Sequence, residues 1–369
     1  MPATVIPDSE VPVVDFSLFN HGTPEQRIKT AKDIVAAFKE VGFVYVVNHH
    51  VADEDIDQAF QHSARVFKLT QEELNKPEVV RPTAEEGAKT YTARGYSALG
   101  REKVSQDVYD DDKLKTLRAV ADFKEFFDIG ADKGPPAVRE PNRFPSKDAI
   151  PSFEDFMLKF FWECHEFGLD ILRAIAIGFD IDEDYFVNFH QDADHLLRLL
   201  HYPAVERKSL VSGAKARIPA HSDFGSITVL FQDSVGGLQV EDSKYPGNYC
   251  KTSALRSYKS SLTHIEIVPA PPLKGSAIVN IGDFLMRWSN NVLKSTLHRV
   301  VEPPVAKQLG NDVELSEERF SIPFFLQADR HKVIQCVPGL EGESGPKYPP
   351  VTAMEYLNMR VAATFKGKG

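Results

Sequence analysis

Residues 221 to 228 read His221-Ser222-Asp223-Phe224-Gly225-Ser226-Ile227-Thr228, and His298 follows far downstream. In an extended strand, residues i and i+2 point to the same face, so His221 and Asp223 can hold one metal ion while Ser222 points away. Two imidazoles and one carboxylate are the set that binds non-haem Fe(II) and leaves positions open for a co-substrate and O₂. A lone His-x-Asp is more often a surface turn or a hydrogen-bonded strand pair, so the surrounding pattern has to decide.

Short β-rich runs separated by Gly, Pro and Asp begin at about Asp194. This spacing is typical of a β-sandwich or jelly roll. His298 lies in one such run, so a facing strand of a barrel can bring it to the metal. The predicted strands are Leu196 to Tyr202, Ser226 to Gln232, Gly237 to Glu241, Ser276 to Ile281, Thr296 to Val301 and Arg319 to Leu326.

Helical patterns occupy much of the chain before Asp194. Apolar residues recur at helical spacing, between capping residues and glycines. We expect helices over Pro24 to Gly42 with Thr23 as N-cap, Ala52 to Leu74, Phe153 to Gly178 with Ser152 as N-cap, and Thr352 to Phe365. Phe43 to Val47 reads as a buried strand, and Lys76 to Asp112 as loops over the barrel mouth.

Composition narrows the class of protein. The 369 residues carry a net charge of −10, which argues against a nucleic-acid partner because such partners need a basic face. No run of about 18 apolar residues and no secretory leader is visible, so we expect a cytoplasmic protein without a membrane span, a monomer or weak oligomer. Cys164, Cys250 and Cys336 are too few and too scattered for a disulfide framework and read as free thiols.

Further stretches along the chain carry a family resemblance. They are Val11 to Phe16, Val41 to His49, Leu197 to Pro203, His221 to Thr228, Gly236 to Val240, Asn280 to Asp283, Ser295 to Val300 and Arg319 to Phe325. With them the chain resembles the isopenicillin-N-synthase-like branch of the Fe(II)/2-oxoglutarate-dependent dioxygenases. The resemblance implies an all-β core with flanking helices (α+β), a double-stranded β-helix or jelly roll. We expect an N-terminal helical and mixed region over residues 1–193, the jelly-roll core over 194–345, and a C-terminal helix and tail over 346–369.

The same resemblance assigns the site. It implies His221, Asp223 and His298 as ligands of Fe(II). Arg319 and Ser321, at i and i+2 of one strand, suit bidentate binding of a carboxylate, and in the family this pair, with the Tyr202 position, binds 2-oxoglutarate. Leu200 stands where many relatives carry Asn. The implied enzyme hydroxylates, desaturates or cyclises a small organic molecule of secondary metabolism with O₂, releasing succinate and CO₂, with ascorbate as a candidate reductant.

Candidate walls of the substrate pocket are apolar residues near the motifs. They are Phe224, Leu230, Phe325 and Leu326, each with an equally good interpretation as core packing. His49, His50, His195, His201 and His264 lack partners at metal-like spacing and read as structural or exposed imidazoles.

Three function classes remain open at this stage. The first is the 2-oxoglutarate-dependent oxygenase, with an ethylene-forming variant as a narrower form. The second is an iron oxidase of the same fold that does not use 2-oxoglutarate, as isopenicillin N synthase and aminocyclopropanecarboxylate oxidase do not; Arg319 and Ser321 fit both. The third is a non-catalytic binding module.

Residues 249–266 have no counterpart in the resemblance, and they lengthen the stretch between Asp223 and His298. They read either as a genuine surface loop, which a hairpin tolerates because loop entropy grows slowly with length, or as a retained intron in the gene model.

Overall fold

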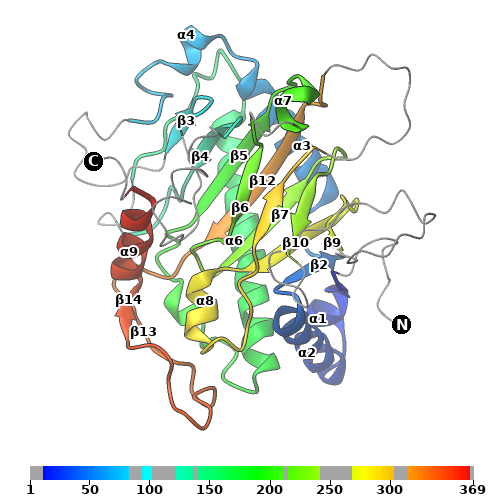
Figure 1. Ribbon diagram of the computed structural model, residues 1–369, viewed down its shortest axis with the longest axis vertical. Coiled ribbons are helices and arrows are strands. Elements are labelled where there is room, and N and C mark those ends of the chain that lie inside the picture. Colours follow the sequence, from blue (N-terminus) through cyan, green and yellow to red (C-terminus); the bar gives the residue numbers. More distant parts are fainter. Residues whose placement is uncertain are drawn as a thin grey trace.

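The computed structural model describes residues 11–82, 94–101, 122–135, 140–211, 215–241, 268–302 and 315–365. Within them, two β-sheets form the core, and helices lie around it (Figure 1). The larger sheet runs, in spatial order, β1 (Val13–Asp15), β2 (Phe43–Val47), β10 (Ser276–Ile281), β7 (Ile227–Gln232), β12 (Arg319–Leu326), β5 (Leu196–Tyr202), β4 (Glu125–Ile129) and β3 (Gly95–Ser97). The smaller sheet runs β6 (Ile218–His221), β11 (His298–Val300), β8 (Leu238–Val240) and β9 (Val268–Pro269).

The two sheets pack face to face and form the jelly roll that the sequence predicts. Side chains from both sheets, among them Tyr45, Ile278, Leu238 and Val300, belong to one buried apolar cluster. The predicted strands β5, β10 and β12 have the expected bounds, and β7, β8 and β11 are shorter than expected by one to three residues. A short pair, β13 (Val333–Ile334) with β14 (Val351–Thr352), leads to the C-terminal helix α9 (Ala353–Phe365).

Strands from the N-terminal part of the chain complete the larger sheet. β1 pairs in parallel with β2, and β2 pairs antiparallel with β10, so the first strands are hydrogen-bonded to the jelly roll. The stretch from Lys76 to Asp112, expected to be loops, contributes β3 within its described residues. Residues 249–266, the segment without a family counterpart, lie outside the described residues.

Helices α2 and α4 begin at capping boxes. α1 (Ser17–His21) precedes α2 (Pro24–Glu40), which begins with the predicted cap: Thr23 Oγ1 accepts from the Gln26 N–H, and Gln26 Oε1 accepts from the Thr23 N–H. The single helix expected over Ala52 to Leu74 is divided into α3 (Asp53–Phe67) and α4 (Gln71–Leu74), because Thr70 forms a second capping box with Glu73.

The long helix α6 (Phe153–Gly178) covers the outer face of the larger sheet. Ser152 occupies its N-cap position but does not cap it by side chain, contrary to the prediction. Its backbone is left-handed (φ 62°), whereas a capping side chain needs an extended backbone to reach the first free N–H groups. Shorter helical elements connect the strands: η2 (Val187–Phe189), α7 (Arg207–Val211) and α8 (Asp283–Trp288).

Packing between α6 and the sheet is close and aromatic. Phe160 contacts Phe231 with ring centroids 5.7 Å apart, and Phe161 contacts Phe324 at 5.0 Å. A Cβ on Gly168 would lie 2.4 Å from Leu326 Cδ2, so any other residue there would force the Leu326 side chain to shift. None of the described helices has both the length and the apolar character required to cross a membrane.

Candidate metal centre and co-substrate pocket

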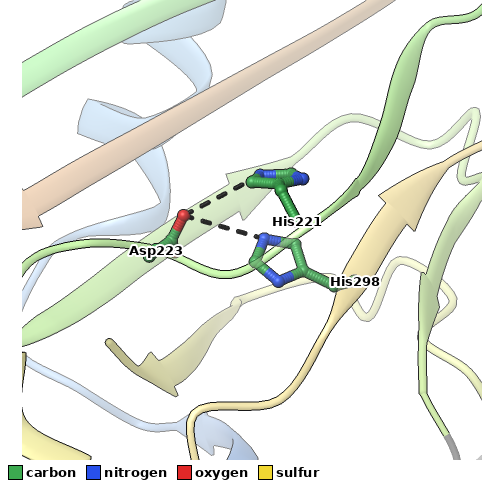
Figure 2. Close-up of side chains that lie close together, drawn as sticks. All are labelled: His221, Asp223 and His298. Carbon is green, nitrogen blue, oxygen red and sulfur yellow. Dashed lines mark ion pairs between the residues drawn. The ribbon is translucent and has the colours of Figure 1, made fainter. Parts of the chain in front are cut away.

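Three side chains, two from the smaller sheet and one from the turn after β6, converge on one point (Figure 2). β6 ends at His221 and is paired with β11 at His298, so the two rings lie side by side with centroids 4.3 Å apart. Asp223 follows β6 in the turn, and its Oδ1 lies 3.8 Å from the Nε2 atom of each histidine. These distances are too long for hydrogen bonds, and the three ligand atoms lie within 4.8 Å of one another. The geometry suits a cation between them.

The opposite side of each candidate ligand is already held by a protein group. The Nδ1–H of His221 donates to the Pro219 carbonyl at 2.9 Å, and that of His298 faces the Thr296 carbonyl at 3.3 Å. A carbonyl can only accept, so both protons stand on Nδ1 and the Nε2 lone pairs face the centre. Such partners orient metal-binding imidazoles.

Asp223 is oriented in the same way. Its Oδ2 accepts hydrogen bonds from Thr228 Oγ1 at 2.6 Å and from Asn280 Nδ2 at 2.8 Å, which leaves Oδ1 toward the histidines. The sequence prediction gave neither residue a role. Thr228 stands five positions after Asp223, but only the pairing of β7 with β10, with Thr228 opposite Asn280, brings both to the carboxylate.

Charge at the centre favours binding of a divalent cation. Burial, followed by the neighbouring His298, lowers the pKa of His221 to about 3, so its imidazole is neutral, the form that binds metals. Burial alone would raise the pKa of Asp223, but His298, His221 and the hydrogen bonds from Asn280 and Thr228 hold it below the ordinary value. Two imidazoles with Nε2 turned toward the centre, beside the Asp223 carboxylate, fit Fe(II).

The buried guanidinium of Arg319 lies on the inner face of the larger sheet, the face that also carries Thr228. Arg319 begins β12 directly opposite Tyr202 of β5, and only 1% of its surface is exposed. Its Nε donates to the Gly236 carbonyl at 2.7 Å, Nη1 to Ser321 Oγ at 3.1 Å, and Nη2 to Gln232 Oε1 at 3.2 Å. The guanidinium carbon lies 5.1 Å from the centroid of the Tyr202 ring. The structure thus brings the three predicted co-substrate residues together.

The four predicted wall residues are divided between different places. Leu230 lies between Thr228 and Gln232 on the inner face of β7, and Phe325 lies on the inner face of β12. Leu326 points to the opposite face and packs in the core against α6, because adjacent strand residues alternate. The structure therefore does not bring Leu326 to the site, contrary to the prediction.

Phe224 lies beneath the C-terminal helix. The guanidinium carbon of Arg360 in α9 is 4.5 Å from the Phe224 ring centroid, and Arg360 also forms a 2.7 Å ion pair with Asp283. Asp283 in turn accepts a hydrogen bond from Ser222 at 2.9 Å. A role for Phe224 in the pocket stays a prediction.

The remaining histidines that the structure describes contribute no atom to the metal cluster. His201 lies between Glu125 and Glu318, at 2.7 and 2.8 Å. His49 and His195 pack against aromatic rings, and His50 faces Asp170 at 3.6 Å. His264 lies outside the described residues. Of the cysteines, Cys164 and Cys336 are free, and Cys250 also lies outside the described residues.

Comparison with known sequences identifies the family. Residues 11–147 match the family described as "non-haem dioxygenase in morphine synthesis N-terminal". Residues 193–328 match the 2OG-Fe(II) oxygenase superfamily. The chain is 36% identical to the 2-oxoglutarate-Fe(II) type oxidoreductase ppzD of Metarhizium rileyi, over 98% of this chain and 93% of the relative. It is 35% identical to the 2-oxoglutarate-dependent dioxygenase frbA of a Dothideomycetidae species, over 96% and 97%.

Solved structures give the same answer. A full-length Neurospora crassa protein, crystallised in complex with alpha-KG and thymine, has a TM-score of 0.78 and 35% identity, covering 98% of this chain and 100% of that one. A 2OG-Fe(II) oxygenase family protein from Caulobacter crescentus has a TM-score of 0.71 and 28% identity, covering 96% and 99%. These names favour the 2-oxoglutarate-dependent class over an oxidase without that co-substrate and over a binding module. The chain belongs to the 2OG-Fe(II) oxygenase superfamily, and it is a 2-oxoglutarate- and Fe(II)-dependent oxygenase.

Proposed function

We propose that His221, Asp223 and His298 hold the Fe(II) of this enzyme, and that Arg319 and Ser321, with Tyr202, bind the distal carboxylate of 2-oxoglutarate. The observation that carries the proposal is the position of Asp223 Oδ1, 3.8 Å from two imidazole Nε2 atoms whose Nδ1 sides face carbonyls. No other group of metal-binding side chains is found among the described residues. The bound metal supplies open coordination positions at which 2-oxoglutarate and O₂ react.

The protein's own part is to fix positions and protonation. Thr228 and Asn280 keep the Asp223 carboxylate turned toward the metal position, and both backbone carbonyls keep the imidazole protons on Nδ1. Hydrogen bonds to Gly236, Ser321 and Gln232 fix the Arg319 guanidinium, so binding an anion there requires little reordering. Leu230 lies between Thr228 and Gln232 on the same face of β7, so an apolar side chain stands between the two groups.

We propose a small organic molecule as the substrate, with hydroxylation, desaturation or cyclisation as the outcome. The 32% identical relative from Petromyces alliaceus is named a proline hydroxylase, and the Neurospora crassa structure holds thymine, so similar chains act on or bind small molecules. The net charge of −10 supports a partner other than nucleic acid. We further propose that the enzyme is cytoplasmic and is a monomer or weak oligomer. The N-terminal region would end at residue 193 and the jelly-roll core at residue 345.

Spectroscopic titration tests the metal and co-substrate assignment. Anaerobic addition of Fe(II) and 2-oxoglutarate should give a metal-to-ligand charge-transfer band, which a library of small molecules is then screened to perturb. Asp223→Ala should abolish the band, and Arg319→Gln should raise the 2-oxoglutarate concentration needed to form it. His331→Ala is the matched control, since that imidazole is 64% exposed and outside the cluster. A charge-transfer band of full intensity in Asp223→Ala would contradict the proposal. So would a rate of succinate release that changes neither with any added small molecule nor in either variant.

A further inference from the structure

Arg217 is a second buried guanidinium whose role neither the fold nor the metal site explains. It directly precedes β6 and is 1% exposed. Its Nη2 donates to the Glu317 carbonyl and lies 3.8 Å from Glu302 Oε2. Its Nε and Nη1 have no hydrogen-bond partner among the residues that the structure describes. Unpaired donors of a buried cation are costly, so a further partner is expected.

The nearby carboxylates are occupied elsewhere or too distant. Oε1 of Glu302 binds Arg207 at 2.9 Å, and its Oε2 is beyond hydrogen-bond distance of Arg217. Asp233 accepts the backbone N–H groups of Phe320 and Val235. Neither carboxylate therefore accepts a hydrogen bond from Nε or Nη1 of Arg217.

Arg217 and Arg319 lie around the same tyrosine. Their guanidinium carbons are 5.9 and 5.1 Å from the centroid of the Tyr202 ring. The Tyr202 hydroxyl is buried and also lacks a hydrogen-bond partner among the described residues. Two cations thus lie within 6 Å of the ring of one tyrosine, where β5 ends and β6 and β12 begin, and Arg217 and the tyrosine hydroxyl both have unused hydrogen-bonding capacity. An anion with several acceptor sites, such as a carboxylate, matches them.

We propose that Arg217 is a second guanidinium for the distal carboxylate of the 2-oxo dicarboxylate co-substrate, and that with Arg319 it selects a dianion over a monoanionic 2-oxo acid. This inference rests on the proposed function, which places that carboxylate at Arg319. A purely structural role is a poorer account, because an apolar side chain of similar size would fill the position without unpaired donors.

Two ligands that differ only at the distal end test the inference. 2-Oxopentanoate has the chain length of 2-oxoglutarate but a methyl group in place of the distal carboxylate. Dissociation constants of both are measured by calorimetry on Mn(II)-loaded, anaerobic protein, so no turnover is involved. Arg217→Gln should weaken 2-oxoglutarate binding by roughly tenfold to a hundredfold, the range for losing a hydrogen bond to a charged group. Its affinity for 2-oxopentanoate should stay within about twofold of the wild type.

Arg207→Gln is the matched control, because Arg207 forms an ion pair with Glu302, as Arg217 does. In the described part of the chain, the cations over the Tyr202 ring are Arg217 and Arg319, so this change leaves the proposed anion site intact. It should leave both dissociation constants unchanged. Arg217→Lys keeps the charge without the planar fork and should give an intermediate loss. Thermal unfolding of the ligand-free variants checks that Arg217→Gln, which loses the 3.8 Å ion pair with Glu302, still folds. If Arg217→Gln does not fold, the inference is overturned, because the residue is then structural.

The remaining outcomes separate the inference from its premise. Equal weakening of both ligands by Arg217→Gln, or no weakening of either, overturns the inference while Arg319→Gln still weakens 2-oxoglutarate selectively. If Arg319→Gln also fails to weaken it, the co-substrate assignment falls and the inference falls with it.

Discussion

The two faces of the larger sheet are built from the same strands and differ in chemistry where β7 and β12 pair. On the face toward α6, Val229, Phe231, Ile322 and Phe324 join one apolar core. On the other face, Thr228 and Gln232 in β7 and Arg319 and Ser321 in β12 bear hydrogen-bonding groups, beside the apolar Leu230 and Phe325. The difference teaches that alternation with period two lets one strand supply stability on one face and recognition on the other.

The two faces also differ in what a substitution should disturb. Apolar packing on the α6 side is non-directional and contributes in proportion to the area removed from water. On the inner face, side chains are held by specific hydrogen bonds whose value lies in orientation. Changes on the outer face should therefore act on unfolding, and changes on the inner face on binding.

The largest expected effect is the loss of a proposed metal ligand. His298→Ala should reduce turnover to background, well beyond the roughly 10- to 100-fold cost of losing a residue that only orients a ligand. Fe(II) affinity, measured by anaerobic titration, should fall with it, while the urea midpoint of the metal-free protein changes little. If this variant still bound Fe(II) stoichiometrically, His298 would not be a metal ligand, and the expected difference between the two faces would fail.

A truncation on the outer face should have the opposite profile. Phe324 is fully buried against Phe161, so Phe324→Ala should lower the free energy of unfolding by about 3–5 kcal/mol. The measurement is urea unfolding of metal-free protein. The fraction that remains folded should bind Fe(II) with unchanged affinity. A large loss of metal affinity with little loss of stability would show that the two faces are not separable.

Acid should weaken the protein through imidazoles buried on the helix side. Burial lowers the pKa of His190 to about 4, while its ring contacts the Phe186 carbonyl at 2.7 Å and Ser226 Oγ at 2.9 Å. The folded state binds fewer protons than the unfolded state, so the stability present above about pH 6.5 is lost as the pH falls toward 4. His190 alone accounts for up to about 3 kcal/mol of this loss.

The free energy of unfolding is measured by chemical denaturation at pH values between 7 and 4.5, with a chelator present, and its slope against pH is compared between variants. His190→Gln cannot be protonated and should flatten it, whereas a substitution of the exposed His331 should not. An unchanged slope in His190→Gln would assign the acid sensitivity to other groups.

The smallest expected effect belongs to a residue that only orients a ligand. Asn280→Ala removes one of the two hydrogen bonds to Asp223 Oδ2 and should weaken Fe(II) binding roughly 10- to 100-fold. Thr228→Ser keeps the second hydroxyl donor and serves as its control. If Asn280→Ala lowers the unfolding free energy as much as Phe324→Ala does, the inner face is as much a packing surface as the outer one.

Local patterns predicted much of this molecule. The bounds of β5, β10 and β12 follow from β-rich runs between turn residues, and the capping residue Thr23 marked the start of α2. The cluster of His221, Asp223 and His298 was expected from the motif and the resemblance. These features depend on neighbours in sequence or on a resemblance over much of the chain.

What was missed depends on contacts between distant residues. Nothing near Phe43 to Val47 indicates that this strand pairs with Ser276 to Ile281. The role of Asn280 requires the pairing of β7 with β10, and the burial of Arg217 requires both sheets. Leu326 was misplaced for a simpler reason, since a wall containing both Phe325 and Leu326 ignores the alternation of strand side chains.

The pairing of β2 with β10 has a consequence for synthesis of the chain on the ribosome. β2 is made early, yet its second neighbour in the sheet emerges only after most of the polypeptide has been translated. At ordinary elongation rates this interval is on the order of ten seconds or more. During it one edge of an apolar strand is exposed to other nascent chains, which makes aggregation a hazard. Yield of folded enzyme should therefore depend on chaperone supply and on translation speed across residues 48–275.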